Sequence, residues 1–324
     1  MNNPLVSIIL FSYNQSGFIS SAIKSMTNQT YPNLEIIIVD NGSTDGSKEV
    51  INKYLGDPRI IFLDHKTNES VSVRHNEVMK ILTGKYVSIL YADDYYLLDK
   101  IQKQVAIFET LDDDYGLIYG PAFREYVKTN NKIIENTCRV SGWCFDSILD
   151  QWSDGYPSPV SPLARSECYF DFPADENIFH GAGEGLFMFF ATKYKFYYVD
   201  EPLAVMRDHD LNAGKRLKDN VVTHHKTMMR LLAQPGLSSK SVSKVSKHLS
   251  YFKMNSAWHL LRSNDDTGDA RNLYSEAILL YPKNLFHGKR LLGLMLCYIP
   301  ATLVKFLNNL TNALFKKDPY IGLD

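Results

Sequence analysis

Apolar and polar positions alternate along the first third of the chain as strands and covering helices do in a βαβ fold. Four apolar runs have the length of strands buried on both faces: Val6–Phe11, Leu34–Val39, Arg59–Leu63 and Tyr86–Leu90. Between these runs, apolar residues recur at helical spacing over residues 18–26, 45–54 and 72–82, and Asp45 is the expected N-cap of the second helix. This order predicts an α/β fold with a mostly parallel sheet.

The pattern changes in the rest of the chain. From about residue 115 the alternation becomes irregular, and residues 143–162 form a loop-like stretch rich in Ser, Pro and aromatic residues. Apolar structure resumes at Phe187–Ala191 and Phe196–Val199, and from about residue 220 the spacing is helical only. We expect one α/β domain over residues 1–215 and a C-terminal helical region over residues 216–324. Two apolar stripes predict a helical hairpin in that region: Trp258, Leu260 and Leu261, then Ala270, Leu273, Ala277 and Leu280.

Composition narrows the class of protein. The chain has 324 residues, of which 45% are hydrophobic and 22% charged, with a net charge of −1, so a nucleic-acid partner is not expected. The beginning of the chain lacks the basic and small-residue features of a secretory signal, and the longest apolar stretch, Leu291–Leu307, is broken by Pro300 and Lys305. We therefore expect a cytoplasmic protein without a spanning helix. No CxxC pair occurs among the four cysteines, which argues against zinc and a disulfide framework: Cys138, Cys144, Cys168 and Cys297.

Candidate site residues follow the predicted strands, because ligands of parallel sheets bind beyond the carboxyl ends of the strands. They are Ser12, Tyr13 and Asn14 after the first strand, Asp40 after the second, and Asp93 and Asp94 after the fourth. A dinucleotide site would need G-x-G-x-x-G after the first strand, and residues 12–17 read SYNQSG instead. For Asp40 alone, a simple turn or cap role remains an alternative.

Two adjacent acids at the end of a buried strand indicate a cation. Asp93 and Asp94 repel each other unless a cation or hydrogen-bond donors offset their charges. Mg²⁺ and Mn²⁺ prefer oxygen ligands and bridge readily to phosphates.

Three stretches taken together resemble a known family. Residues 6–15, 28–45 and 83–94 are similar, in order and separation, to the inverting family 2 glycosyltransferases of the Rossmann-like GT-A fold, and the resemblance covers about residues 4–210. It implies transfer of a sugar from a nucleotide-diphosphate donor to an acceptor hydroxyl, in the synthesis of a cell-surface polysaccharide or glycan. UDP is the commonest nucleotide among relatives, and dTDP and GDP stay open. The donor half would be about residues 1–115 and the acceptor half about residues 116–215.

The resemblance also implies roles for single residues. Asp40 would bind the base or ribose, above a floor made by the backbone of Ser12, Tyr13 and Asn14. Asp93 would lie against the ribose or sugar. Asp94 and His209, which follows an Arg-x-His segment, would hold Mn²⁺ or Mg²⁺ on the diphosphate.

For the phosphate-binding cation and the catalytic base, this sequence departs from the family's motif. Where the family has an Arg-Asn pair this chain reads Arg74-His75-Asn76, and we favour Arg74 because a guanidinium fork suits a diphosphate. Two family acids are replaced here, by Tyr91 and by Asn41. The base implied by the resemblance is Glu184, with Asp175 and Glu176 as alternatives, and a carboxylate favoured by a helix start is the other reading of Glu184.

The middle of the chain and its C-terminal region are the parts expected to contact the acceptor and other partners. A glycan or lipid-linked acceptor would meet the aromatic residues of the irregular middle, Trp143, Trp152 and Tyr156. Residues 285–324 suit an anionic membrane surface, a core helix or a dimer helix, so peripheral attachment at the inner face of the plasma membrane and homo-oligomerisation both stay open. The alternatives to a glycosyltransferase are a nucleotidyltransferase and a sugar-nucleotide-binding module without activity.

Overall fold

The computed structural model describes residues 3–151, 157–178, 185–212, 215, 217–263, 267–283, 288–299 and 302–304. The chain divides into two compact units, residues 1–212 and 213–324. None of the described helices is long and apolar enough to cross a bilayer.

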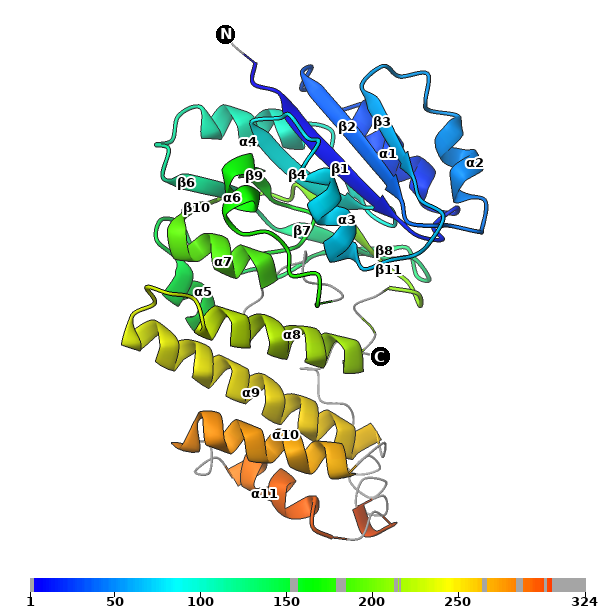
Figure 1. Cartoon of the computed structure of the whole chain (residues 1–324). Helices are drawn as coiled ribbons and strands as arrows, with labels where there is room; N and C mark the ends of the chain where they lie inside the picture. The colour runs from blue at the N-terminus through cyan, green and yellow to red at the C-terminus, as the bar shows by residue number, and fades with distance from the viewer. Residues whose placement is uncertain are drawn as a thin grey trace. The chain divides into compact units, whose positions relative to one another are not determined.

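The first unit is built on a seven-stranded sheet in the order β10-β6-β9-β4-β1-β2-β3, shown in Figure 1. All neighbours in it are parallel except those of β9, which pairs antiparallel with β4 and β6. The predicted mostly parallel α/β sheet is therefore confirmed. Its strands are β1 (Val6–Ser12), β2 (Leu34–Asp40), β3 (Ile60–Asp64), β4 (Tyr86–Tyr91), β6 (Tyr115–Tyr119), β9 (Leu163–Arg165) and β10 (Lys195–Tyr198).

Both faces of the sheet are covered. Alternate residues of β1, such as Val6, Ile8 and Leu10, pack with helices of one face, and Ile9, between them, is equally buried. The helices of the first unit are α1 (Ile19–Thr27), α2 (Ser47–Asn52), α3 (Val71–Val78), α4 (Lys100–Phe108), α5 (Phe145–Asp150), α6 (Ser166–Asp171) and α7 (Gly185–Lys193).

Two local predictions are corrected. The helix expected over residues 72–82 ends at Val78, and the N-cap of α2 is Gly46 with φ +93°, not Asp45. The Asp45 carboxylate still accepts the backbone N–H of Ser47 at 3.0 Å, and its other oxygen accepts the N–H of Ser16 at 2.9 Å. Asp45 thus joins two loops as well as supporting the start of the helix.

A second, four-stranded sheet, in the order β5-β11-β7-β8, has no counterpart among the predicted strands. Its key feature is that β11 pairs antiparallel with β5, so the end of β11 lies beside the residues that precede β5. The strands are β5 (Tyr95–Tyr96), β7 (Ala122–Tyr126), β8 (Asn131–Ile134) and β11 (Ala204–Asp208).

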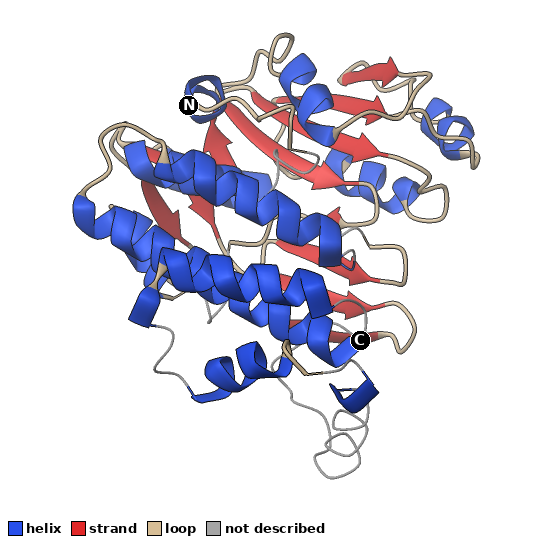
Figure 2. Ribbon diagram, turned by 60° about the horizontal axis from the view of Figure 1, so that its bottom comes forward, coloured by secondary structure: helices blue, strands red, loops and turns tan. Residues whose placement is uncertain are grey.

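The regular elements described in the second unit are all helices, which Figure 2 draws in blue. Helices α9 and α10 form the predicted hairpin, with Ala257, Leu261, Ala270 and Ala277 in a shared core. Its main helices are α8 (Leu217–Leu232), α9 (Ser239–Ser263), α10 (Thr267–Leu280) and α11 (Gly288–Leu296).

Candidate functional site

The predicted donor residues lie at one edge of the main sheet. Ser12, Asp40 and Asp64 end β1, β2 and β3 and are direct neighbours in the strand register. Tyr91 ends β4 beside Phe11 of β1. The carboxyl ends of four strands therefore gather the loops that carry the candidate chemistry.

Two of these loops are joined by hydrogen bonds. The N–H of Asn14 donates to Ser43 Oγ at 2.9 Å, and Asn14 Oδ1 accepts the N–H of Thr44 at 2.8 Å. Asn14 has φ +52°, a left-handed conformation that asparagine tolerates better than most residues. The loop after β1 is thereby fixed against the loop after β2, while the Tyr13 side chain stays exposed.

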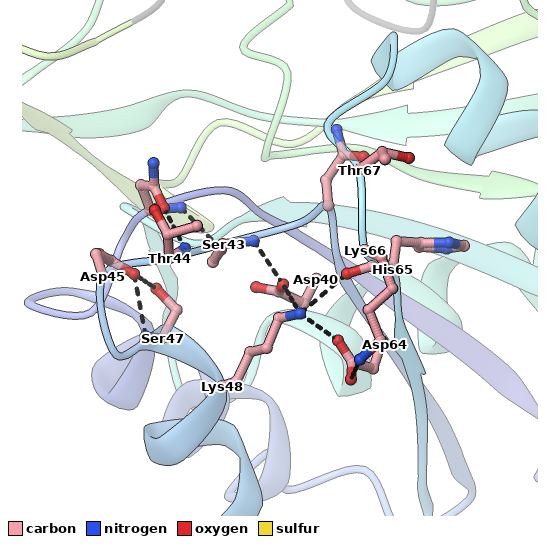
Figure 3. Close-up of polar contacts among 12 residues, drawn as sticks. Asp40, Ser43, Thr44, Asp45, Ser47, Lys48, Asp64, His65, Lys66 and Thr67 are labelled. Carbon is pink, nitrogen blue, oxygen red and sulfur yellow. Dashed lines mark hydrogen bonds and ion pairs between the residues drawn. The ribbon is translucent and has the colours of Figure 1, made fainter.

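Asp40 is fully buried and only partly satisfied (Figure 3). Its Oδ2 accepts the N–H of Ser43 at 2.9 Å and lies 3.6 Å from Lys48 Nζ. Its Oδ1 has no hydrogen-bond partner, and the buried Ser12 Oγ on the neighbouring strand has none either. Because an unsatisfied buried polar atom costs free energy, this pair of atoms is suited to a polar ligand at the sheet edge.

Lys48, which the sequence analysis did not single out, links two strand ends in Figure 3. Its Nζ lies 2.5 Å from Asp64 Oδ1 and donates to the carbonyl oxygen of His65 at 2.9 Å. The hydrogen bond from Lys48, with that from Lys66, lowers the pKa of the Asp64 carboxyl, and the same bond to Asp64 raises the pKa of Lys48. Lys48 therefore places a positive charge beside Asp40.

Arg74 lies buried behind the same loops. Its Nε donates to Asn41 Oδ1 at 2.9 Å, and one terminal nitrogen donates to the Thr67 carbonyl oxygen at 3.0 Å. The other terminal nitrogen donates to Glu77 at 3.3 Å. In this arrangement the guanidinium holds residues 67–69 against Asn41, the position where the family has a second acid.

The paired acids lie where the two sheets meet. Asp94 Oδ1 accepts the backbone N–H of Arg207 at 2.8 Å, just beyond the antiparallel pairing of β5 with β11. Burial, and then the charge of Asp93, raise the pKa of the Asp94 carboxyl well above its usual range. Asp93 Oδ2 lies 3.2 Å from His209 Nε2. Of the predicted metal residues, the structure thus brings His209 directly to Asp93, one residue before Asp94.

Two further residues connect this cluster to the first loop. The Phe18 ring stacks on His209 with a centroid distance of 4.7 Å. The Arg207 guanidinium lies 5.5 Å from the Phe18 ring and 4.5 Å from the Tyr95 ring, and it donates to the Asp93 carbonyl oxygen at 3.0 Å. Arg207 was recognised only as part of the Arg-x-His segment, because its place beside Asp93 depends on a residue more than a hundred positions away.

The donor atoms in this cluster fit a divalent metal in chemical type. Carboxylate oxygens and one imidazole suit Mn²⁺ and Mg²⁺, which commonly take remaining ligands from substrate phosphates. Over the part of the chain that the structure describes, no group of three or more His, Cys, Asp or Glu side chains is arranged to hold a metal ion. Asp93 and His209 meet, whereas Asp94 Oδ1 is bonded to the backbone of β11.

Glu184, Trp152 and Tyr156 lie outside the described residues. The segment before Glu184 is anchored to α3: Asn76 Nδ2 donates to the Ala174 carbonyl oxygen at 2.9 Å, and the Ala174 N–H donates back to Asn76 Oδ1 at 3.0 Å. Ser72 Oγ donates to the Ile178 carbonyl oxygen at 2.7 Å.

Of the two alternative bases, Glu176 accepts a hydrogen bond from Asn76, and Asp175 accepts one from the N–H of Asn177. Trp143 is exposed.

His75, which takes the family's Arg position, is not at the surface. It is fully buried against the Tyr169 ring at 5.3 Å, and burial lowers its pKa to about 4. A neutral, buried imidazole is unsuited to pairing with phosphate charge.

Sequence comparison identifies related proteins. The sequence model described as Glycosyl transferase family 2 matches residues 7–154. The UDP-Glc:alpha-D-GlcNAc-diphosphoundecaprenol beta-1,3-glucosyltransferase WfaP of Escherichia coli is 40% identical over 106 residues, which are 33% of this chain and 42% of that protein. An uncharacterized glycosyltransferase of Rickettsia conorii is 30% identical over 209 residues, which are 64% of this chain and 33% of that protein. The chain thus spans less than half the length of these relatives.

Comparison with solved structures identifies the fold. Residues 1–349 of S. aureus TarS, in complex with UDP-GlcNAc, superpose with a TM-score of 0.66 at 13% identity, covering 98% of this chain and 95% of that one. The mannosyltransferase PcManGT from Pyrobaculum calidifontis, in complex with GDP-Man and Mn²⁺, gives a TM-score of 0.59 at 14% identity, covering 98% and 89%. These likenesses confirm the predicted GT-A-type α/β fold followed by helices. With the sequence matches, they support a family 2 glycosyltransferase domain that includes residues 7–154.

Proposed function

We propose that this chain is a metal-dependent, inverting glycosyltransferase that uses a nucleotide-diphosphate sugar, with UDP as the favoured nucleotide. The observation that carries the proposal is the pair of unsatisfied buried atoms, Asp40 Oδ1 and Ser12 Oγ, at the same sheet edge as the Asp93–His209 contact. A nucleoside offers the donors and acceptors that these atoms lack. The complexes of TarS with UDP-GlcNAc and of PcManGT with GDP-Man and Mn²⁺ support this class of donor.

In the proposed site, the donor half is about residues 1–115 and the acceptor half about residues 116–215. Ser12, Tyr13, Asn14 and Asp40 bind the nucleoside, and Asp93 lies against the ribose or sugar. Arg74 acts on the phosphate side, through its hold on residues 67–69. Asp94 and His209, beside Asp93, hold Mn²⁺ or Mg²⁺, which when bound offsets the charge that gathers on the leaving diphosphate.

The chain's own residues supply the remaining chemistry. Glu184 accepts the proton of the acceptor hydroxyl while that oxygen attacks the anomeric carbon from the face opposite the diphosphate. The bond from the anomeric carbon to the diphosphate oxygen breaks in the same step, so the configuration at this carbon inverts. Asn76 and Ser72 hold residues 174–178 to α3, so this described part of the segment before Glu184 lies against the donor half.

The acceptor is proposed to be a glycan or lipid-linked glycan of a cell-surface polysaccharide. The E. coli relative carries a diphosphoundecaprenol acceptor in its name, and a relative from Bacillus subtilis, 37% identical over 103 residues, is named a putative teichuronic acid biosynthesis glycosyltransferase. Those residues are 32% of this chain and 41% of that protein. A polyprenol-linked acceptor implies that the enzyme works at the cytoplasmic face of a membrane.

The test is turnover of a panel of UDP-, dTDP- and GDP-sugars with Mn²⁺ or Mg²⁺, measuring the released nucleotide product. Asp94→Ala should abolish metal-dependent transfer, and Glu184→Gln should lower kcat by about 10²- to 10⁴-fold while donor binding persists. Asp113→Asn, at a fully exposed acid, is the matched control and should behave as wild type.

Three results would contradict the proposal. Undiminished transfer by wild type in the presence of a chelator would exclude the metal. Release of pyrophosphate would indicate the nucleotidyltransferase, and binding of a sugar nucleotide without any turnover would indicate a binding module.

A further inference from the structure

Helix α11 has one face packed against the other helices of its unit. Gly293 lies so close to α10 that a Cβ there would be 2.0 Å from the Tyr274 hydroxyl oxygen and 3.1 Å from the Trp258 ring. Cys297, one turn later, is buried in the core formed by α9 and α10. This face fixes how α11 lies within the second unit.

The opposite face of α11 is apolar and exposed. Leu292 is 50% exposed, Met295 61% and Tyr298 65%, and Leu291 beside them is 42% exposed. Leu292 and Met295 are three residues apart and so lie on one side of the helix, and Tyr298 follows in the turn after α11. Exposed apolar side chains that are gathered into one patch, and not scattered singly, are a feature of interaction surfaces.

The charge of this part of the chain indicates what covers the surface. From Ala277 to Lys317 the sequence contains six Lys or Arg residues and no Asp or Glu, although the whole chain has a net charge of −1. One further cation is attached to the apolar face itself. The Arg271 guanidinium lies 4.6 Å from the Tyr298 ring and donates to the Cys297 carbonyl oxygen at 3.0 Å.

We propose that the outer face of α11 and of the turn after it, defined by Leu291, Leu292, Met295 and Tyr298, docks on an anionic lipid surface. Apolar side chains enter the interface between headgroups and acyl chains, and a segment of sequence that is rich in Lys and Arg and free of acids is attracted to anionic headgroups. A second copy of this chain is a poorer occupant, because a self-complementary contact would bring two acid-free basic segments together.

This docking surface deepens the proposed function, because it would hold the enzyme beside a lipid-linked acceptor. The surface itself is independent of the catalytic residues, so its test needs no nucleotide or acceptor. A failure of the transferase assay would leave the binding result unchanged.

The test is co-sedimentation of the full chain with vesicles of mixed phosphatidylglycerol and phosphatidylcholine, and with vesicles of phosphatidylcholine alone. Wild type should bind the anionic vesicles preferentially, and added salt should weaken binding because it screens the charges. The double variant Leu292→Glu/Met295→Glu should bind at least about tenfold more weakly.

The matched control is Val222→Glu/Met229→Glu on α8, where the two side chains are 54% and 44% exposed. In Figure 1, α8 lies on the other side of α9 from α11, so this control adds the same charge away from the proposed surface. It should bind as wild type does. Sedimentation velocity and circular dichroism on all three proteins report association and folding.

Two outcomes overturn the proposal. One is equal binding by the α11 variant and wild type. The other is a wild-type dimer that the α11 variant converts to monomer while neither protein binds vesicles, which would assign the surface to a second copy. Preferential loss of vesicle binding in the α11 variant, with its fold intact, supports the lipid surface.

Discussion

Lys100 is a fully buried lysine whose ammonium group is surrounded by polar partners. Its Nζ donates to Ser88 Oγ and to Gln104 Oε1, each at 2.8 Å, and to the Pro162 carbonyl oxygen at 3.2 Å. Burial lowers its pKa well below the usual lysine value. Since Gln104 Nε2 also donates to the Ser161 carbonyl oxygen at 2.9 Å, this network attaches the segment before β9 to α4.

We predict that Lys100→Met destabilises the protein by about 1–3 kcal/mol. The substitution keeps the length of the side chain but leaves the Gln104 amide oxygen without this donor and removes one of the two donors to the Pro162 carbonyl oxygen. Urea unfolding followed by circular dichroism measures the change. Lys103→Met, three residues along α4 and paired only with half-exposed acids, is the control and should cost less than about 1 kcal/mol. A Lys100→Met protein as stable as wild type would mean that the network does not hold the segment before β9.

The sequence predicted the location of those candidate site residues that follow long apolar strands. Asp40, Asp93 and Asp94 were found because strand ends can be read from a single chain segment. Lys48, Phe18 and Arg207 were missed because each acquires its place through contacts with distant residues: Lys48 with Asp64, Phe18 with His209, and Arg207 with Asp93. Their partners are 16 or more positions away, and no local pattern marks such pairs. The functional roles of all these residues stay predictions.

At the level of elements, the strands of the main sheet could be predicted from the sequence, whereas those of the four-stranded sheet could not. In β1 all seven residues are buried, so its apolar run is visible in the sequence, and β2 and β4 are nearly as clear. In β7 only Ala122 is buried, and β8 is exposed throughout. β5 has two residues and pairs with β11 more than a hundred positions later. Short, half-exposed strands with distant partners carry no periodicity that a sequence pattern could reveal.

Gly84, in the turn before β4, lies in close contact with β1, and this contact leads to a prediction. A Cβ on Gly84 would lie 2.5 Å from both the backbone nitrogen and Oγ of Ser7. The Gly84 N–H also donates to Ser7 Oγ at 2.9 Å, so the two strands cannot separate without losing this bond. Gly84→Ala should therefore destabilise the protein by about 1–3 kcal/mol, the usual cost of inserting atoms into a packed core.

Thermal and urea unfolding of Gly84→Ala measure this cost. Gly56→Ala is the control, since a Cβ there would meet no atom within 4 Å. If both variants unfolded at the same urea concentration, the close approach of Gly84 to β1 would not be needed for the packing of the sheet.

At the level of the whole molecule, both units contain histidines that are held neutral by burial. His75 in the first unit has its pKa lowered to about 4, and in the second unit burial lowers the pKa of His224 to about 3 and that of His248 to about 4. His224 Nε2 lies 3.1 Å from His248 Nε2, and a charge on His248 would oppose protonation of His224. His225 and Lys253 also act on His224 in this direction.

These shifts predict acid sensitivity of the entire chain. A histidine in the unfolded chain binds a proton as the pH falls below about 6.5, whereas these three remain neutral in the fold until about pH 4 or below. The contribution of these histidines to stability is therefore full above about pH 6.5 and is lost as the pH falls toward 4, by about 1–2 kcal/mol per histidine near pH 5.5.

Urea unfolding between pH 8 and pH 5.5 should give a midpoint that falls with pH, and in the His224→Gln/His248→Gln variant the fall should be smaller. The range from pH 7 to pH 8, where none of the three changes charge, is the internal control. Equal slopes in wild type and the double variant would show that the pair does not set the acid response, and would leave His75 to account for it.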